Sequence, residues 1–366
     1  MKSKLLLLSL AIHVAVFGQE TLEFQDLFSA TSSEHVACYR IPALVTAPNG
    51  DLLAAIDQRV TSCNDLGGNP DINIALRRST DNGKSWSKTK IVVDFTEGKS
   101  ASDPSFIVDQ ETKEIFLFYN YMNLAKEKDI YYLHFIKSKD NGQSWSEPRD
   151  ITAQISKEDW RTDFKFITSG RGIQTRSGRL LHTLVNLKHG LHLFASDDHG
   201  KTFYLLDTPL LPGDESKVVE LIDGTLLVNS RVNKGGMRYS HTSEDLGAKW
   251  KSAPLPNLID PSCNASIIRY TDKADGYSKN RLLFSNAKNI GERINMTVRI
   301  SYDEGKTWTK GKTVYKGPSA YSSLSVLDNG DIGLFFEKDE YTENVFTSFS
   351  LKWLTDGEDE YQNPTR

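Results

Sequence analysis

Side chains that can bind anions, transfer protons or act as nucleophiles recur in short segments spread over most of the chain. Arginine guanidinium groups hold carboxylates through paired hydrogen bonds, aspartate and glutamate move protons, and a tyrosine phenol becomes nucleophilic once a base removes its proton. The segments that combine these types are Tyr39-Arg40-Ile41-Pro42, Asp57-Gln58-Arg59, Asn64-Asp65, Ser102-Asp103-Pro104-Ser105, Glu215-Ser216-Lys217, Asn229-Ser230-Arg231, Arg293-Ile294-Asn295, Tyr321-Ser322-Ser323 and Phe336-Glu337. One such segment alone is a weak signal, so the fold must bring several of them together if they form one site.

The elements that could position these segments are indicated by an internal repeat. The pattern Ser-x-Asp-x-Gly-x-x-aromatic occurs five times, with starts 47 to 59 residues apart. The Asp side chain can accept backbone N–H groups within a turn, the Gly supplies a positive φ, and the aromatic side chain can pack back onto a sheet. The five copies are Ser79–Trp86, Ser138–Trp145, Ser196–Phe203, Ser243–Trp250 and Ser301–Trp308. We interpret them as structural turns between strands and not as ligand contacts.

Short β-rich runs precede and separate these turns, for example residues 72–77, 130–136 and 295–300. Helical periodicity is not sustained over any stretch of fifteen or more residues. Short antiparallel strands repeated about every fifty residues are typical of a β-propeller. The sequence therefore predicts an all-β propeller.

The composition limits the classes of protein to which the chain can belong. The chain has 366 residues, 44 Lys and Arg against 48 Asp and Glu, and 38% hydrophobic residues. A near-neutral chain with this apolar content is expected to fold compactly, and its net charge of −4 does not favour a nucleic-acid partner.

The first residues resemble a secretory signal. Lys2 and Lys4 precede the mostly apolar run Leu5–Phe17, and the small residues Val16 and Gly18 flank the expected cleavage position. The run is short for a bilayer span, which needs about 20 apolar residues. We expect a signal peptide at residues 1–18 and a secreted protein, extracellular or periplasmic, without stable membrane insertion.

Three cysteines, Cys38, Cys63 and Cys263, are too few for a disulfide framework in a chain of this length. At most one disulfide is expected, with buried free thiols an equal alternative. For Cys63 we favour a small packing residue over a reactive thiol.

The ordered segments, taken with the five turns, resemble the sialidase (neuraminidase) family over residues 35–350. Gly170-Arg171-Gly172-Ile173-Gln174 adds to this resemblance. The resemblance implies a six-bladed β-propeller that forms one catalytic domain over residues 19–366, acting on sialylated glycans without a metal or cofactor. We also expect a monomer.

Three arginines match the family's substrate clamp, namely Arg40, Arg231 and Arg293. Sialic acid carries a carboxylate on its anomeric carbon, and a guanidinium fork binds that group bidentately. Glu337 matches a carboxylate that braces one clamp arginine.

Tyr321 and Glu215 match the family's nucleophile and base. A neutral phenol avoids the repulsion that a carboxylate nucleophile would meet beside the substrate's own carboxylate. Because a phenol has a pKa near 10, it needs a base to take its proton. Glu220 is the competitor for Glu215; its spacing to Arg231 fits the family less well, so we interpret Glu220 as a structural strand residue.

Asp65 matches the family's acid/base, six residues after Arg59. The following segment, residues 66–70, is longer than in many relatives, which leaves Asp71 as a competitor. Arg59 and Asp103 match positions that contact the sugar's 4-hydroxyl region.

The resemblance therefore implies a retaining exo-sialidase that hydrolyses terminal α-linked sialic acids. One alternative is sialyl transfer or intramolecular release of an anhydro-sugar. Trans-sialidases place a tryptophan beside the third clamp arginine, whereas here Asn289-Ile290-Gly291-Glu292 precedes Arg293. A more remote alternative is a propeller that only binds glycans. Linkage and acyl preference stay open.

Overall fold

Short strands dominate the part of the chain that the computed structural model describes, residues 22–32 and 35–364. The expected signal peptide at residues 1–18 lies outside the described residues. None of the helices in the described ranges is long and apolar enough to cross a membrane.

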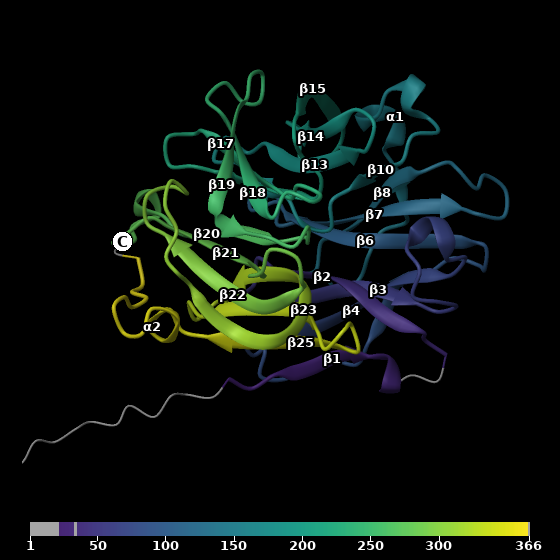
Figure 1. Cartoon of the computed structure of the whole chain (residues 1–366). Helices are drawn as coiled ribbons and strands as arrows, with labels where there is room; N and C mark the ends of the chain where they lie inside the picture. Colours follow the sequence, from purple (N-terminus) through teal and green to yellow (C-terminus); the bar gives the residue numbers. More distant parts are fainter. Residues whose placement is uncertain (1–21, 33–34, 365–366) are drawn as a thin grey trace, which may run out of the picture.

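The strands of the described residues form five hydrogen-bonded sheets (Figure 1). The first contains β2 (Cys38–Thr46), β3 (Leu52–Arg59), β4 (Ile72–Ser79) and β5 (Lys90–Val93). The second contains β6 (Lys99–Val108), β7 (Ile115–Asn123), β8 (Tyr132–Ser138) and β9 (Arg149–Asp150), with β11 (Gly170–Arg171) added parallel to β6. The third contains β10 (Lys165–Ile167), β12 (Ile173–Gln174), β13 (Leu180–Asn186), β14 (Gly190–Ser196) and β15 (Tyr204–Leu210).

The fourth and fifth sheets follow in chain order. The fourth contains β16 (Ser216–Glu220), β17 (Leu226–Ser230), β18 (Met237–Ser243) and β19 (Lys251–Ile259). The fifth contains β20 (Ser266–Thr271), β21 (Arg281–Ala287), β22 (Ile294–Ser301), β23 (Lys312–Val326), β24 (Ile332–Lys338), β25 (Glu343–Phe349) and β1 (Gln25–Ser29). The helices are single turns: α1 (Thr152–Ile155), α2 (Leu351–Leu354), η1 (Ala30–Ser32), η2 (Leu66–Gly68), η3 (Glu158–Trp160) and η4 (Lys273–Asp275).

The core lies between the faces of successive sheets. One apolar cluster joins the first sheet to the second, and further clusters join the second to the third, the third to the fourth and the fourth to the fifth. The ring closes because β1 pairs with β25, so the first and last strands lie side by side (Figure 1), and a cluster that includes Phe28 and Phe346 packs them against the first sheet. The predicted all-β, propeller-like arrangement is therefore confirmed.

The five repeated turns have the geometry that their sequence predicts. In each copy the Ser Oγ donates to the Asp Oδ1 at 2.7–2.9 Å and accepts the Gly backbone N–H at 2.8–2.9 Å. The same Asp oxygen accepts the backbone N–H four residues further on. The Gly has φ between 74° and 97°. A Cβ on Gly83 would lie 2.3 Å from the Phe346 ring, so this turn also needs the small residue to approach the neighbouring sheet.

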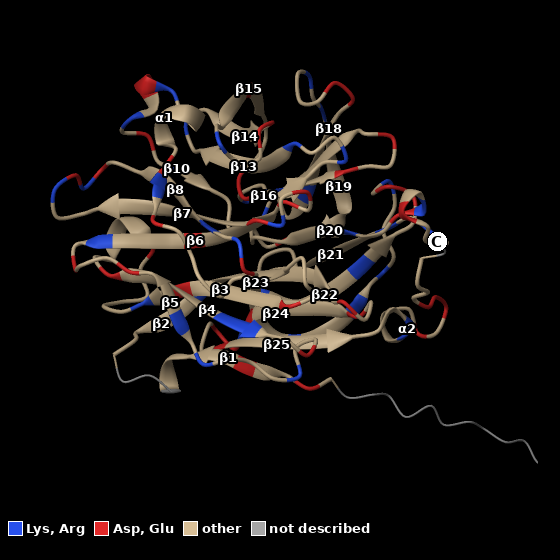
Figure 2. Ribbon diagram, turned by 180° about the vertical axis from the view of Figure 1, so that it is seen from behind, with Lys and Arg blue, Asp and Glu red and all other residues tan. Residues whose placement is uncertain are grey.

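Figure 2 shows basic and acidic residues interspersed around the molecule, many of them in loops and at strand ends. A few charged or polar side chains lie instead on or beside the innermost strands. Arg40 lies near the start of β2, Asp103 lies in β6, Glu215 directly precedes β16, and Tyr321 lies in β23. Four sheets thus deliver charged or polar side chains toward the same end of the inner strands.

Candidate active site

One cavity of about 400 Å³ is lined by strand residues of four sheets and by loop residues, among them those that flank β16 and β17 of the fourth sheet. Seven of the nine residues that the sequence predicts for the site line it: Arg40, Asp65, Asp103, Glu215, Arg231, Arg293 and Tyr321. The other two, Arg59 and Glu337, lie behind its wall. The rim is apolar and partly aromatic, formed by Tyr131, Phe164, Phe166 and Leu187.

Tyr321 and Glu215 form the central pair. The Tyr321 Oη donates a hydrogen bond of 2.7 Å to Glu215 Oε2, and both side chains are buried, with Tyr321 8% exposed. Burial and the Glu215 charge raise the pKa of Tyr321 well above its usual range. The resting phenol is therefore neutral, and Glu215 is the acceptor placed to take its proton.

Three guanidinium groups surround this pair. Arg231 Nη1 donates to Glu215 Oε2 at 2.5 Å and to Tyr321 Oη at 3.3 Å. The guanidinium carbons of Arg40 and Arg293 lie 5.7 and 5.5 Å from the Tyr321 ring centroid. A phenolate formed here, or an anion beside it, would meet positive charge from three directions.

Glu337 holds one of these arginines, as the sequence predicts for a bracing carboxylate. Its Oε1 accepts Arg40 Nε at 2.6 Å and the Ile41 backbone N–H at 3.0 Å, while its Oε2 accepts the Tyr321 backbone N–H at 3.0 Å. Burial lowers the pKa of Arg40, but the charge and hydrogen bond of Glu337, together with Tyr321 and Tyr341, outweigh this and raise the pKa overall. Ile41 has φ 69°, a strained conformation for a β-branched residue, and the Glu337 contact helps to hold it. One buried carboxylate thus positions both the clamp and the backbone of Tyr321.

Arg293 is held by neighbours that the sequence did not predict. Its Nη1 donates to Tyr341 Oη at 3.2 Å, its Nη2 donates to the Ser262 carbonyl at 3.1 Å, and the Tyr341 ring stacks 3.8 Å from the Arg40 guanidinium carbon. Tyr341 has φ 73° in a tight turn after β24. No local sequence pattern indicates this role, because it depends on where the turn folds back.

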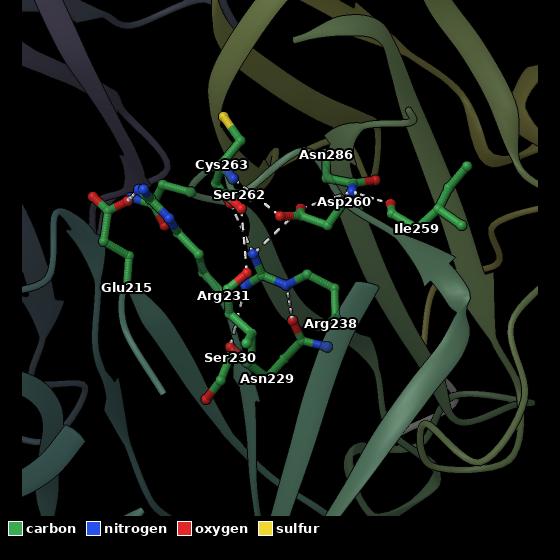
Figure 3. Close-up of polar contacts among 12 residues, drawn as sticks. Glu215, Asn229, Ser230, Arg231, Arg238, Ile259, Asp260, Ser262, Cys263 and Asn286 are labelled. Atoms are coloured by element: carbon green, nitrogen blue, oxygen red, sulfur yellow. Dashed lines mark hydrogen bonds and ion pairs between the residues drawn. The ribbon is translucent and has the colours of Figure 1, made fainter. Parts of the chain in front are cut away.

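A second buried network lies beneath Arg231 (Figure 3). Arg238, fully buried on β18, donates to Asn229 Oδ1 and to the Cys263 carbonyl, both at 2.8 Å. Asp260 accepts from Arg238 at 3.4 Å and from the Cys263 backbone N–H at 3.0 Å. This network fixes the loop whose Ser262 carbonyl holds Arg293. An arginine in a strand and an aspartate directly after the next strand were the available signal, and the sequence analysis missed it.

Asp103 lies beside a second carboxyl group, that of Asp57. Its backbone N–H donates to Asp57 Oδ1 at 2.9 Å, and its own Oδ2 accepts from Asn120 at 2.9 Å. Burial and the Asp57 charge raise the pKa of Asp103 well above its usual range. The raised pKa favours the protonated Asp103 carboxyl group, the form that can donate a hydrogen bond into the cavity.

Arg59 does not line the cavity, although the sequence suggested contact with the substrate. Its guanidinium group is 1% exposed and bonds Asp57 Oδ2 at 3.1 Å, Asp65 Oδ1 at 2.8 Å and the Cys63 carbonyl at 2.8 Å. Arg59 thus joins the buried Asp57 to the loop that carries Asp65.

Asp65 lies at the start of η2, and its side chain is 88% exposed.

A disulfide joins Cys63 to Cys38, so the favoured interpretation of Cys63 as a small packing residue is wrong. The pairing depends on the β2–β3 hairpin, which brings residues distant in sequence together. Cys263 is the buried free thiol of the described chain.

The two competitors named from the sequence lie elsewhere. Asp71 precedes β4 and does not line the cavity, whereas Asp65 does. Glu220 ends β16 and accepts the Arg176 backbone N–H at 2.7 Å, remote from Tyr321. The geometry therefore brings Asp65 and Glu215 into the site and leaves Asp71 and Glu220 out of it.

Comparisons with known proteins agree with this arrangement. A family described as "BNR repeat-like domain" matches residues 50–334. The chain is 36% identical over 364 residues to a sialidase from Micromonospora viridifaciens, covering 92% of this chain and 55% of that protein. The chain belongs to the sialidase family with BNR repeats. Sialidases are glycoside hydrolases, so the family is one of enzymes.

Other sialidases match over a similar range. A sialidase from Bacteroides fragilis is 29% identical, with 87% of this chain and 63% of that protein covered. The solved structure of the Hadza microbial sialidase Hz136 superposes with a TM-score of 0.80 at 28% identity, covering 90% of this chain and 69% of the other. A leech intramolecular trans-sialidase has a TM-score of 0.78 at 21% identity, covering 92% and 71%, which shows a shared fold. The chain spans between half and two thirds of the length of the two curated relatives named here.

Proposed function

We propose that the protein is a retaining exo-sialidase that hydrolyses terminal α-linked sialic acids from glycoconjugates. The observation that carries the proposal is the buried hydrogen bond of 2.7 Å between Tyr321 Oη and Glu215 Oε2, surrounded by Arg40, Arg231 and Arg293. An anionic sugar suits this cavity because three guanidinium groups offset the charge of a bound carboxylate.

In the first step the Tyr321 oxygen attacks the anomeric carbon while Glu215 takes the phenolic proton. The glycosidic bond breaks, and Asp65 gives its proton to the leaving oxygen. Arg231 contacts both Glu215 and Tyr321, so its charge stabilises the developing phenolate. The product of this step is a sialyl-tyrosine intermediate and a free aglycone.

In the second step Asp65, now a carboxylate, removes a proton from water. The water oxygen attacks the anomeric carbon, the bond to Tyr321 breaks, and the tyrosine recovers its proton from Glu215. Two displacements at one carbon retain its configuration. The exposure of Asp65 suits this exchange of a proton with water.

Asp103 completes the proposed substrate contacts. In its protonated form, which burial and the Asp57 charge favour, Asp103 donates a hydrogen bond to a sugar hydroxyl without repelling the substrate carboxylate. Arg59 acts in this scheme through Asp65: it donates to Asp65 Oδ1 at 2.8 Å, and the other carboxyl oxygen of Asp65 carries the proton that is transferred. Arg59 is therefore a positioning residue.

The test is product identification by time-resolved proton NMR during digestion of 3′-sialyllactose. We expect α-sialic acid to appear first and the β-anomer to follow by mutarotation. Initial release of the β-anomer would overturn retention. An anhydro-sialic acid would identify the intramolecular reaction, and a new sialoside formed from added lactose would identify transfer.

We favour hydrolysis because the cavity walls formed by the described residues include no tryptophan. A tryptophan beside the third clamp arginine is the feature that the family resemblance links to sialyl transfer. Asn289–Glu292, which precede Arg293, make no such stacking surface. A purely glycan-binding protein would not need the buried Tyr321–Glu215 pair.

We also propose that the fold has six blades. Strand β23 pairs with β22 through residues 312–318 and with β24 through residues 319–326, so the seven-stranded sheet consists of two four-stranded halves that share one strand. An apolar cluster packs these halves together as other clusters pack successive sheets. A crystal structure with regular six-fold spacing of the inner strands would test this count.

Secretion is part of the same proposal. The Cys38–Cys63 disulfide supports it, because disulfides persist in oxidising compartments. Amino-terminal sequencing of protein recovered outside the cytoplasm should begin near Gln19.

A further inference from the structure

A second cavity, of about 500 Å³, lies at the other end of the inner strands from Tyr321. The residue Thr46 that ends β2 lines it, whereas Arg40 near the start of β2 lines the catalytic cavity. In the same way Val108 ends β6 and Glu220 ends β16, while Asp103 and Glu215 face the catalytic cavity. Five or six strand residues separate the two cavities, roughly 15–20 Å.

Arg171 lines this second cavity and differs from the two other arginines there. Arg176 pairs with Asp272 and donates to the Ile222 carbonyl, and Arg269 pairs with Glu304. Within residues 22–32 and 35–364, by contrast, no side chain or carbonyl bonds the Arg171 guanidinium. Its nitrogens are not occluded, so they face the space of the cavity.

An unpaired guanidinium inside a protein is costly unless solvent or an anion satisfies it. Burial alone lowers the pKa of Arg171 to about 10, with no acidic neighbour opposing that effect. Arg171 nevertheless keeps its charge at neutral pH. Its planar fork is free to bind an oxyanion bidentately.

The walls restrict the kind of anion. Apolar side chains, among them Val108, Ile173 and Val219, face the cavity, and its volume exceeds that of an inorganic ion. Acidic side chains also surround it: Glu111, Glu220, Asp272 and Asp275. They outnumber the three arginines, so a single negative charge at Arg171 is tolerated better than two.

We propose that Arg171 forms a second, non-catalytic site that binds a small monocarboxylate with a hydroxylated body, the chemistry of a sugar acid. The carboxylate bonds the Arg171 fork, the hydroxyl groups meet the Gln110 amide and the carboxylates that line the cavity, and the carbon skeleton lies against the apolar wall. The site does not depend on the catalytic assignment, because none of its residues lines the cavity around Tyr321.

The test is an amide NMR titration of the full chain carrying Arg293→Ala, a change that weakens carboxylate binding at the catalytic cavity. The probes are D-glucuronate, free N-acetylneuraminic acid, D-glucose as the matched ligand without a carboxylate, and inorganic phosphate. We expect saturable shifts of amides 171–176 with at least one of the two sugar acids and not with glucose. Arg171→Gln added to this background should weaken that binding about tenfold or more, and Arg171→Lys should give an intermediate loss.

Turnover distinguishes this proposal from the proposed function. Arg171→Gln in the otherwise native protein should keep kcat/KM for 3′-sialyllactose within about twofold, since the site lies remote from Tyr321. Unchanged binding in Arg171→Gln, or no sugar-acid binding at amides 171–176, would overturn the site. Tighter binding of phosphate than of either sugar acid would overturn the assignment to monocarboxylates.

Discussion

The surroundings of Tyr321 and the loop that carries Asp65 line the same cavity but are held in different ways. Tyr321 lies in a strand, is 8% exposed, and is fixed through its backbone N–H to Glu337 and through its hydroxyl to Glu215. Asp65 lies on a loop, is 88% exposed, and is held by Arg59. The proposed nucleophile needs fixed geometry and a dry environment, whereas an acid/base must exchange protons with water.

A consequence is that changes on the Tyr321 side should reduce turnover of every substrate, while changes on the Asp65 loop should depend on the leaving group. Formation of the intermediate always needs the phenolic oxygen. Protonation of the leaving oxygen matters less when the aglycone is already a stable anion. The experiments below test this difference, from the largest expected effect to the smallest.

Tyr321→Phe should produce the largest loss, because it removes the oxygen that forms the intermediate. We expect kcat to fall on the order of 10³-fold or more for both 3′-sialyllactose and an aryl sialoside of low leaving-group pKa. Circular dichroism and thermal unfolding should match the native protein. A well-folded variant with native rates would contradict the assignment of the nucleophile.

Glu215→Gln should follow, because the amide cannot take the phenolic proton. We expect a loss of about 10²- to 10³-fold on both substrates. Glu220→Gln is the matched control on the same strand segment, since Glu220 bonds the Arg176 backbone and not Tyr321. The reverse ranking of these two variants would exchange their roles.

Much of this nucleophile side could be predicted from the sequence, because its residues sit in short recognisable segments on inner strands. A bracing role of Glu337 toward one clamp arginine was predicted, but neither the choice of Arg40 nor the bonds from two backbone N–H groups to Glu337 were. Those bonds depend on how β2 and β24 meet, which no local pattern reports. The repeated turns could be predicted because the hydrogen bonds that define each turn join residues within one eight-residue copy.

The acid loop was harder to predict for the same physical reason. Arg59 matches a family position, yet it lies behind the wall because Asp57 and Asp65 both hold it. The Cys38–Cys63 disulfide requires the end of a hairpin and a following loop to meet, a long-range relation that spacing alone does not give. Where interacting residues are distant in the chain, their types indicated the chemistry, but which residues contact one another depends on the fold.

Asp65→Ala should separate the two substrates. We expect a loss of about 10²-fold or more on 3′-sialyllactose and a much smaller loss on the activated aryl sialoside, because the latter needs little protonation. Added azide should restore part of the aryl turnover by attacking the intermediate without a base. Asp71→Ala is the control, and any small effect should be equal on both substrates. A leaving-group-dependent loss in Asp71→Ala alone would move the acid to Asp71.

The smallest effect is expected from opening the Cys38–Cys63 disulfide, and it tests the comparison most directly. The bond ties the loop before Asp65 to the start of β2, while Tyr321 keeps its own contacts with Glu337 and Glu215. The double variant Cys38→Ser/Cys63→Ser should lose about 3.5 kcal/mol of unfolding free energy at most, as expected for closing a loop of 25 residues. Its kcat/KM should fall a few-fold on 3′-sialyllactose and less on the aryl sialoside.

The control is a reductant applied to both proteins. The native enzyme should shift toward the double variant in both stability and substrate ratio, and the double variant should not respond. If reduction lowers turnover of the two substrates equally, the disulfide supports the nucleophile side as well, and the division between a fixed strand side and a separately held acid loop does not hold. If only 3′-sialyllactose turnover falls, the Arg59 contact alone does not hold Asp65 in place, because Arg59 remains in the variant.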